Sequence, residues 1–132
     1  MTSERREKLK VRSLDPPLLT FDLRALVLQV KNEDAWRHGE RHTMPLFKTE
    51  RMRVMRIALR AGAALSSHRA DGPITVQVIE GRIRFSAEAK TVTLTEGHML
   101  SLQAGIPHAV DAVEEAVCLL TVAAAPPAAP TP

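Results

Sequence analysis

The sequence is poor in the residues on which several common classes of protein depend. It contains one cysteine, Cys118, so no disulfide can form within the chain. Its aromatic residues are three phenylalanines and one tryptophan, with no tyrosine, a small stock for stacking on nucleic-acid bases. No apolar run approaches the roughly 18 residues of a membrane span, and the charged N-terminus lacks the apolar segment of a signal peptide. We therefore expect a cytoplasmic protein with no membrane partner, in which Cys118 is a core residue.

Familiar catalytic motifs are also missing. There is no glycine-rich phosphate loop, no Cys-x-x-Cys pair and no Gly-x-Ser-x-Gly nucleophile elbow. The pair Glu114-Glu115 follows one apolar segment and precedes the next, a setting that favours a solvated turn. No two carboxylates are spaced to share an inward face for acid–base work. The residues alone therefore predict no particular reaction.

The 132 residues divide into one folded domain and two flanking segments. Residues 1–20 form a basic, mostly irregular arm that carries much of the net charge of +3. The basic charge of this arm could serve to bind nucleic acid, but no aromatic residues interleave with its cations. We therefore expect a solvated arm rather than an interaction module, and no nucleic-acid partner. Residues 21–123 hold a helix and a series of strands, and residues 124–132, with four prolines, predict a disordered tail.

One amphipathic helix is predicted from about Asp22 to Trp36. Asp22 is a suitable N-cap, and Gly39 is a plausible stop. The apolar residues recur with the period of one helix face. They are Leu23, Leu26, Val27 and Val30. A helix of this kind buries that stripe against another element, and the segments that follow are strands.

The strands are short, evenly spaced and separated by turn residues, which predicts an all-β antiparallel sandwich or barrel. Pro45 weakens the first of them. The expected strands are Thr43–Lys48, Met52–Arg60, Ile74–Ile79, Arg82–Ala87, Thr91–Thr95, Met99–Gln103, His108–Val113 and Ala116–Val122.

Two stretches of this strand region, from Gly62 to Gly81 and from Gly97 to His108, resemble the two sequence motifs of the cupins. The matching positions are Gly62, His68 and Gly81 in the first motif and Gly97, Gly105 and His108 in the second. The resemblance covers about residues 52–122 and is to small bacterial single-domain cupins. It implies an RmlC-like double-stranded β-helix, an antiparallel jelly-roll barrel, preceded here by the amphipathic helix.

The resemblance also implies a site, because metal-binding cupins use the positions of His68 and His108 as two of three histidine ligands beside a carboxylate. In this chain Ala70 stands in place of the other histidine, and Ile74 (or Thr75) stands in place of the carboxylate. The metal signature is thus half lost. What remains is an implied pocket formed by His68, His108, Ile74 and Ala70.

Two interpretations of the histidine pair follow. In the first, His68 and His108 are neutral groups that top a mostly apolar pocket for a small molecule, with no tightly bound cofactor. In the second, they hold a divalent transition metal (zinc, nickel, iron or manganese) weakly with a borrowed ligand, as in a metal-dependent oxygenase or isomerase. Asp71 is the nearest carboxylate, but its Asp-Gly-Pro setting favours a turn.

The remaining polar residues of interest are expected outside this pocket. We expect His38, His42 and His98 on the surface. Gln77 has the parity of Thr75 and Ile79 and should point out of the barrel. That outer face and the apolar helix stripe together exceed what one small barrel needs to cover, so we expect a homodimer.

Overall fold

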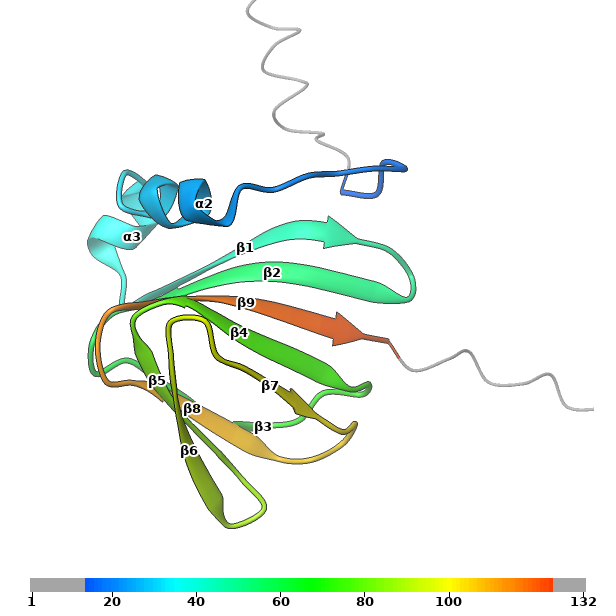
Figure 1. The fold of residues 1–132 in the computed structure, drawn as a ribbon, viewed down its shortest axis with the longest axis vertical. Coiled ribbons are helices and arrows are strands. Elements are labelled where there is room, and N and C mark those ends of the chain that lie inside the picture. Colours follow the sequence, from blue (N-terminus) through cyan, green and yellow to red (C-terminus); the bar gives the residue numbers. More distant parts are fainter. Residues whose placement is uncertain (1–13, 125–132) are drawn as a thin grey trace, which may run out of the picture.

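The computed structural model describes residues 14–124, which form two short helices followed by nine strands (Figure 1). The basic arm as far as residue 13 and the tail from residue 125 lie outside the described residues, so the expectations for them stay predictions. The elements are α2 (Leu23–Val30), α3 (Asp34–His38), β1 (Arg41–Lys48), β2 (Met52–Leu59), β3 (Ala64–His68), β4 (Ile74–Glu80), β5 (Arg82–Ala87), β6 (Lys90–Thr95), β7 (Met99–Leu102), β8 (His108–Ala112) and β9 (Ala116–Ala123).

The strands form two antiparallel sheets that face each other. The larger sheet has the order β1-β2-β9-β4-β7, and the smaller has the order β3-β8-β5-β6. The helices lie on the outer side of the larger sheet (Figure 1). The all-β antiparallel sandwich predicted from the strand spacing, with helical structure before it, is therefore confirmed. Neither helix of the described residues combines the length and the hydrophobicity that crossing a membrane would require.

The glycines of the two sequence motifs sit where the backbone turns with positive φ. The φ angles are 86° at Gly62, 91° at Gly81, 86° at Gly97 and 75° at Gly105. Gly81 joins β4 to β5, and a Cβ there would lie 2.2 Å from the carbonyl oxygen of Glu115. A side chain at this position would therefore meet both backbone strain and a backbone clash. The spacing of the glycines in the two motifs therefore corresponds to the positions of these turns between strands.

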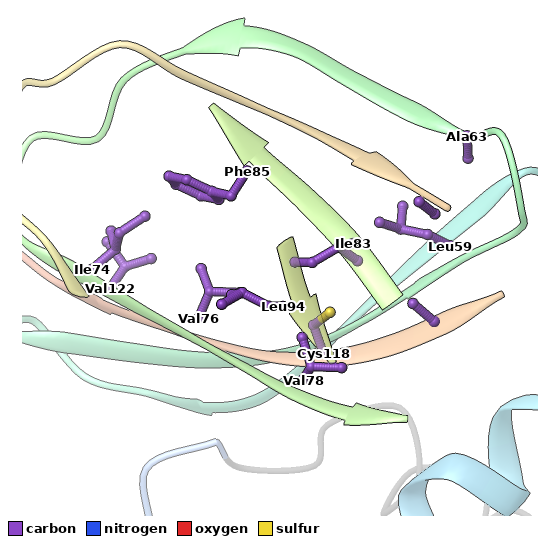
Figure 2. Close-up of a cluster of buried hydrophobic side chains, with 12 residues drawn as sticks. Leu59, Ala63, Ile74, Val76, Val78, Ile83, Phe85, Leu94, Cys118 and Val122 are labelled. Atoms are coloured by element: carbon purple, nitrogen blue, oxygen red, sulfur yellow. The ribbon is translucent and has the colours of Figure 1, made fainter. Parts of the chain in front are cut away.

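The main core lies between the inner faces of the two sheets, as Figure 2 shows. Ile74, Val76 and Val78 alternate along β4 with less buried residues, and they face Ile83 and Phe85 of β5. Burying a large aliphatic or aromatic side chain contributes roughly 1.5–3 kcal/mol each. Cys118 is 3% exposed within this cluster, which confirms that it is a core residue.

A second, smaller core lies beneath the helices. Val27, Val30 and Trp36 are buried against Ala58 and Val117 of the larger sheet. Ile79 packs against this cluster from β4. The apolar helix stripe is thus covered within the chain by the sheet face that includes Ile79. Gln77 lies on this same outer face, opposite to the buried positions of β4.

This packing changes the argument for a homodimer. The helix stripe and part of the outer face of β4 cover each other, so they are not free for a second copy. The homodimer stays a prediction, but the helix stripe and Ile79, on which the expectation partly rested, are already covered within the chain.

The predicted helix differs from the structure in being broken into two. α2 ends at Val30, and Glu33 is extended, with φ −90° and ψ 135°, before α3 begins. Residues 31–33, Lys-Asn-Glu, include no apolar side chain to hold a continuous stripe. The break lets the Glu33 side chain reach a buried arginine of the sheet, Arg56, while Trp36 still packs into the second core.

The strand β3 was not expected from the sequence. Its residues are mostly exposed, and Leu65 is its one large apolar side chain, so the local pattern carries little signal. Pairing with β8 determines its conformation, with a register shift between Leu65 and His68. His68 therefore ends a strand, whereas no strand was expected from the sequence between Arg60 and Ile74.

Candidate functional site

His68 and His108 lie side by side, although they are 40 positions apart in the sequence. They are partners in the ladder between β3 and β8. Their ring centroids are 4.3 Å apart, and the ring planes are tilted by 60°. β8 lies between β3 and β5, so His108 is 5% exposed, whereas His68, on the edge strand, is exposed. Phe85 of β5 stacks on His108 at a centroid distance of 5.2 Å.

Each imidazole is held by a hydrogen bond to the backbone carbonyl two residues earlier in the chain. The Nδ1 atom of His68 lies 3.1 Å from the carbonyl oxygen of Ser66, and Nδ1 of His108 lies 3.1 Å from that of Ile106. A carbonyl oxygen can only accept, so Nδ1 carries the hydrogen in both rings. In a neutral ring the other nitrogen, Nε2, is then an acceptor.

Burial affects the charge of His108. Desolvation is the largest cause that lowers the pKa of His108 from its ordinary 6.5; the backbone bond to Ile106 raises it, and repulsion from His68 lowers it further. The neutral imidazole, with Nε2 free to accept, is therefore the form that this environment favours.

Beneath the two rings is a cavity of about 60 Å³, measured as the space open to the centres of water molecules. Its walls come from the inner faces of both sheets, part of which Figure 2 shows. The lining residues are Ile57, Leu59, Leu65, His68, Ile74, Val76, Ile83, Phe85, His108, Val110, Cys118 and Leu120. No acidic residue, lysine or arginine belongs to this lining.

Comparison with known proteins gives the fold a name. No protein-family model and no curated protein matches the sequence. Among solved structures, a cupin superfamily protein from Desulfitobacterium hafniense superimposes with a TM-score of 0.70 over 86% of this chain and 97% of that one, at 16% identity. The chain has the cupin fold.

Other solved cupin-like structures show how widely this architecture is used. A conserved protein of unknown function from Streptococcus pyogenes matches with a TM-score of 0.66 and 20% identity, over 86% of this chain and 94% of that one. Salicylate 1,2-dioxygenase from Pseudoaminobacter salicylatoxidans, solved with gentisate, matches with a TM-score of 0.60 and 18% identity, over 74% of this chain but 28% of the enzyme. At these identities the likeness concerns the fold, and the chemistry has to be argued from the site.

The cupin site of this chain does not fit a tightly held metal ion. A transition metal in a protein site is generally held by at least three protein donors. Within residues 14–124 no three histidine, cysteine, aspartate or glutamate side chains are grouped to hold one. Ile74, where a carboxylate would stand, is buried in the cavity wall. Two imidazoles are the donors that remain.

Ala70 packs against the main core, but neither Ala70 nor Asp71 is among the residues that line this cavity. The pocket inferred from the sequence included Ala70, but this residue lines a separate, polar hollow together with Arg69 and Asp71. The physical reason is that β3 ends at His68, and the chain then leaves the sheet in the loop that leads to β4. Asp71 is exposed in that loop, and within residues 14–124 it is not grouped with the two histidines as a third ligand.

Cys118 adds a thiol to the cavity wall but no reactive group. Burial raises the pKa of this thiol to about 12. Because the thiolate is the nucleophilic form of cysteine, Cys118 acts near neutral pH as a small apolar residue.

The other histidines differ among themselves. His98 and His38 are exposed, as expected. The Nδ1 atom of His98 accepts a hydrogen bond of 3.0 Å from the backbone N–H of Thr95. His42, expected on the surface, is instead half-buried, and its Nδ1 lies 3.1 Å from Nη2 of the buried Arg56. Nothing in the sequence pattern of β2 indicated that Arg56 would be covered.

Proposed function

We propose that this cupin binds a compact, mostly apolar small molecule in the cavity beneath His68 and His108, without a tightly bound metal. The observation that carries the proposal is the composition of the walls. Nine of the twelve lining residues are aliphatic or phenylalanine, one is Cys118, and the two imidazoles are the strongly polar groups. Such a container, largely apolar with a few convergent polar groups, is typical of sites for small molecules.

The volume limits what can enter. One water needs on the order of 10–15 Å³ by this measure, so a cavity of about 60 Å³ has room for roughly five heavy atoms. Even the best very small ligands gain at most about 1.5 kcal/mol per non-hydrogen atom. A fragment of this size would therefore bind with a dissociation constant no lower than about micromolar. His68 is exposed, so a larger ligand would enter by its apolar end from the histidine side.

A cavity-filling substitution tests the proposal. Val110 lines the cavity from β8, whereas Val113, just beyond the same strand, is 40% exposed. We expect Val110→Phe to abolish the binding of five-atom apolar rings such as thiophene, because the added ring occupies their space. Val113→Phe, the matched control, should bind as the parent does. Titrations followed by the methyl resonances of cavity residues would measure both.

The proposal fails if the parent protein binds no such fragment, or if Val110→Phe binds it as well as the parent does. Circular dichroism of each variant would establish that the fold is retained, and Val110→Leu offers a smaller filling change should the phenylalanine variant not fold.

A further inference from the structure

We infer that the ligand of this cavity is a hydrogen-bond donor: a compact apolar molecule whose N–H or O–H group meets the Nε2 atoms of His68 and His108. This inference rests on the proposed function and adds the chemical class of the ligand. It comes from the hydrogen bonds of the two imidazoles, which place the ring hydrogen on the same nitrogen, Nδ1, in both histidines.

Both rings are held in the same tautomer. The carbonyl oxygens of Ser66 and Ile106 each face an Nδ1 atom, and neither oxygen can supply a hydrogen. The hydrogen of each neutral imidazole is therefore placed on Nδ1, and each Nε2 keeps its lone pair. Within residues 14–124 no protein group donates a hydrogen bond to either Nε2 atom, so both lone pairs are open to a ligand.

His98 provides a contrast within the same protein. Its Nδ1 receives the backbone N–H of Thr95, so its hydrogen belongs on Nε2. The arrangement at His68 and His108 is thus imposed locally by the carbonyl oxygen two residues earlier in the chain, and it is not common to every histidine of the protein.

The Nε2 acceptors of these two neighbouring rings select among polar ligands. A ligand N–H or O–H satisfies a lone pair that the apolar walls cannot. A ligand carbonyl or ether would instead bring a further acceptor into a site that has none of the donors it needs, and would remain unpaired. A carboxylate would meet no lysine or arginine among the lining residues. The site therefore favours small alcohols and N–H heterocycles over ketones, ethers and acids.

Pyrrole and furan form a matched pair of probes for this selection. Both are flat five-atom rings of nearly equal shape, and pyrrole offers an N–H donor where furan offers an acceptor oxygen. At pH 8, where imidazole is ordinarily neutral, we expect pyrrole to bind about tenfold more tightly than furan, the difference of roughly one hydrogen bond. Titration followed by the resonances of the cavity residues would give both affinities.

The ring nitrogens can be observed directly in the same samples. In protein labelled with ¹⁵N, two-bond correlations between ring nitrogens and carbon-bound hydrogens distinguish the two neutral tautomers. His68 and His108 should show hydrogen on Nδ1, and His98 should show it on Nε2. Hydrogen on Nε2 in either cavity histidine of the free protein would overturn the inference.

A variant pair ties the selectivity to the imidazole. His68→Leu removes one acceptor at an exposed position on an edge strand, and we expect the pyrrole preference to fall severalfold toward that of furan. His98→Leu, the control, should keep the full preference. Equal binding of pyrrole and furan to the parent protein would overturn the donor inference while leaving the proposed cavity binding intact. If neither ring perturbs the cavity resonances, both the inference and the proposed function are wrong.

Discussion

Among individual residues, His108 has the environment that most directly links the site to stability. It is 5% exposed, stacked on Phe85 and bonded through Nδ1 to the carbonyl of Ile106. Burial lowers its pKa from the ordinary 6.5 of the unfolded chain. As the pH falls through that value, the unfolded chain takes up a proton before the folded protein does. The stability that neutral His108 contributes is therefore present above about pH 6.5 and is lost as the pH falls.

We predict that His108→Asn weakens the pH dependence of stability. The asparagine amide can still donate to the carbonyl of Ile106, but it does not titrate. Urea unfolding between about pH 7.5 and 5.5 should show a smaller loss of unfolding free energy in the variant than in the parent. An unchanged slope in His108→Asn would contradict this account of the burial.

At the residue scale, the resemblance to the cupin motifs placed His68, His108 and Ile74 at one pocket, and all three line the cavity. The resemblance also placed Ala70 at that pocket, but Ala70 follows the end of β3 and is not among the lining residues. The stacking of Phe85 on His108 depends on the register between β5 and β8. Alternation along Arg82–Ala87 shows that Phe85 is buried, but pairing partners cannot be read from one strand.

At the scale of elements, a buried arginine joins the helices to the larger sheet. Arg56 of β2 is fully buried. Its Nη1 donates to the carbonyl oxygen of Leu26 at 3.5 Å, and its Nη2 lies 2.5 Å from a carboxylate oxygen of Glu33 and 3.1 Å from His42. Its Nε is the one buried side-chain nitrogen or oxygen of residues 14–124 that lacks a hydrogen-bond partner. Glu33 therefore supplies the negative charge that compensates the buried guanidinium of Arg56.

We predict that Glu33→Gln destabilises the protein by roughly 3 kcal/mol, because it leaves a buried guanidinium without its carboxylate. Glu80 provides a matched control, since it pairs with Arg24 at 3.7 Å and with Lys31 at 3.8 Å on the exposed surface of the same helix–sheet junction. Glu80→Gln should cost less than about 1 kcal/mol. Equal losses in urea unfolding for the two variants would show that the buried pair is no stronger than the surface one.

The two elements that the sequence did not predict correctly, the helix break and β3, share a physical cause. In both, distant contacts decide a conformation for which the local residues have little preference. The contact of Glu33 with Arg56 spans 23 positions, and the pairing of His68 with His108 spans 40. By contrast, β4 and β5 were predicted closely because β-branched and alternating residues already favour them locally.

For the whole molecule, the cupin fold was predictable because its glycines, hairpins and strand spacing all favour the same architecture. The oligomeric state was harder to predict from the sequence than the fold. The homodimer stays a proposal, and Val92 and Met99, at 44% and 61% exposure on β6 and β7, are apolar residues still open to a partner. The cavity is lined by residues of one chain. Our proposal is that this cavity holds a small molecule and that its two imidazoles act as acceptors rather than as part of a tight metal site.

Elemental analysis of the untagged protein by plasma mass spectrometry, before and after dialysis against a chelator, distinguishes these two roles of the histidines. A tag is excluded because its histidines would bind metal themselves. With two imidazole donors, and with Ile74 in the position of a carboxylate, we expect well under one equivalent of any transition metal, removed by the chelator. One equivalent of zinc, iron, nickel or manganese that survives chelation in the parent, and is lost in His68→Ala, would contradict the claim.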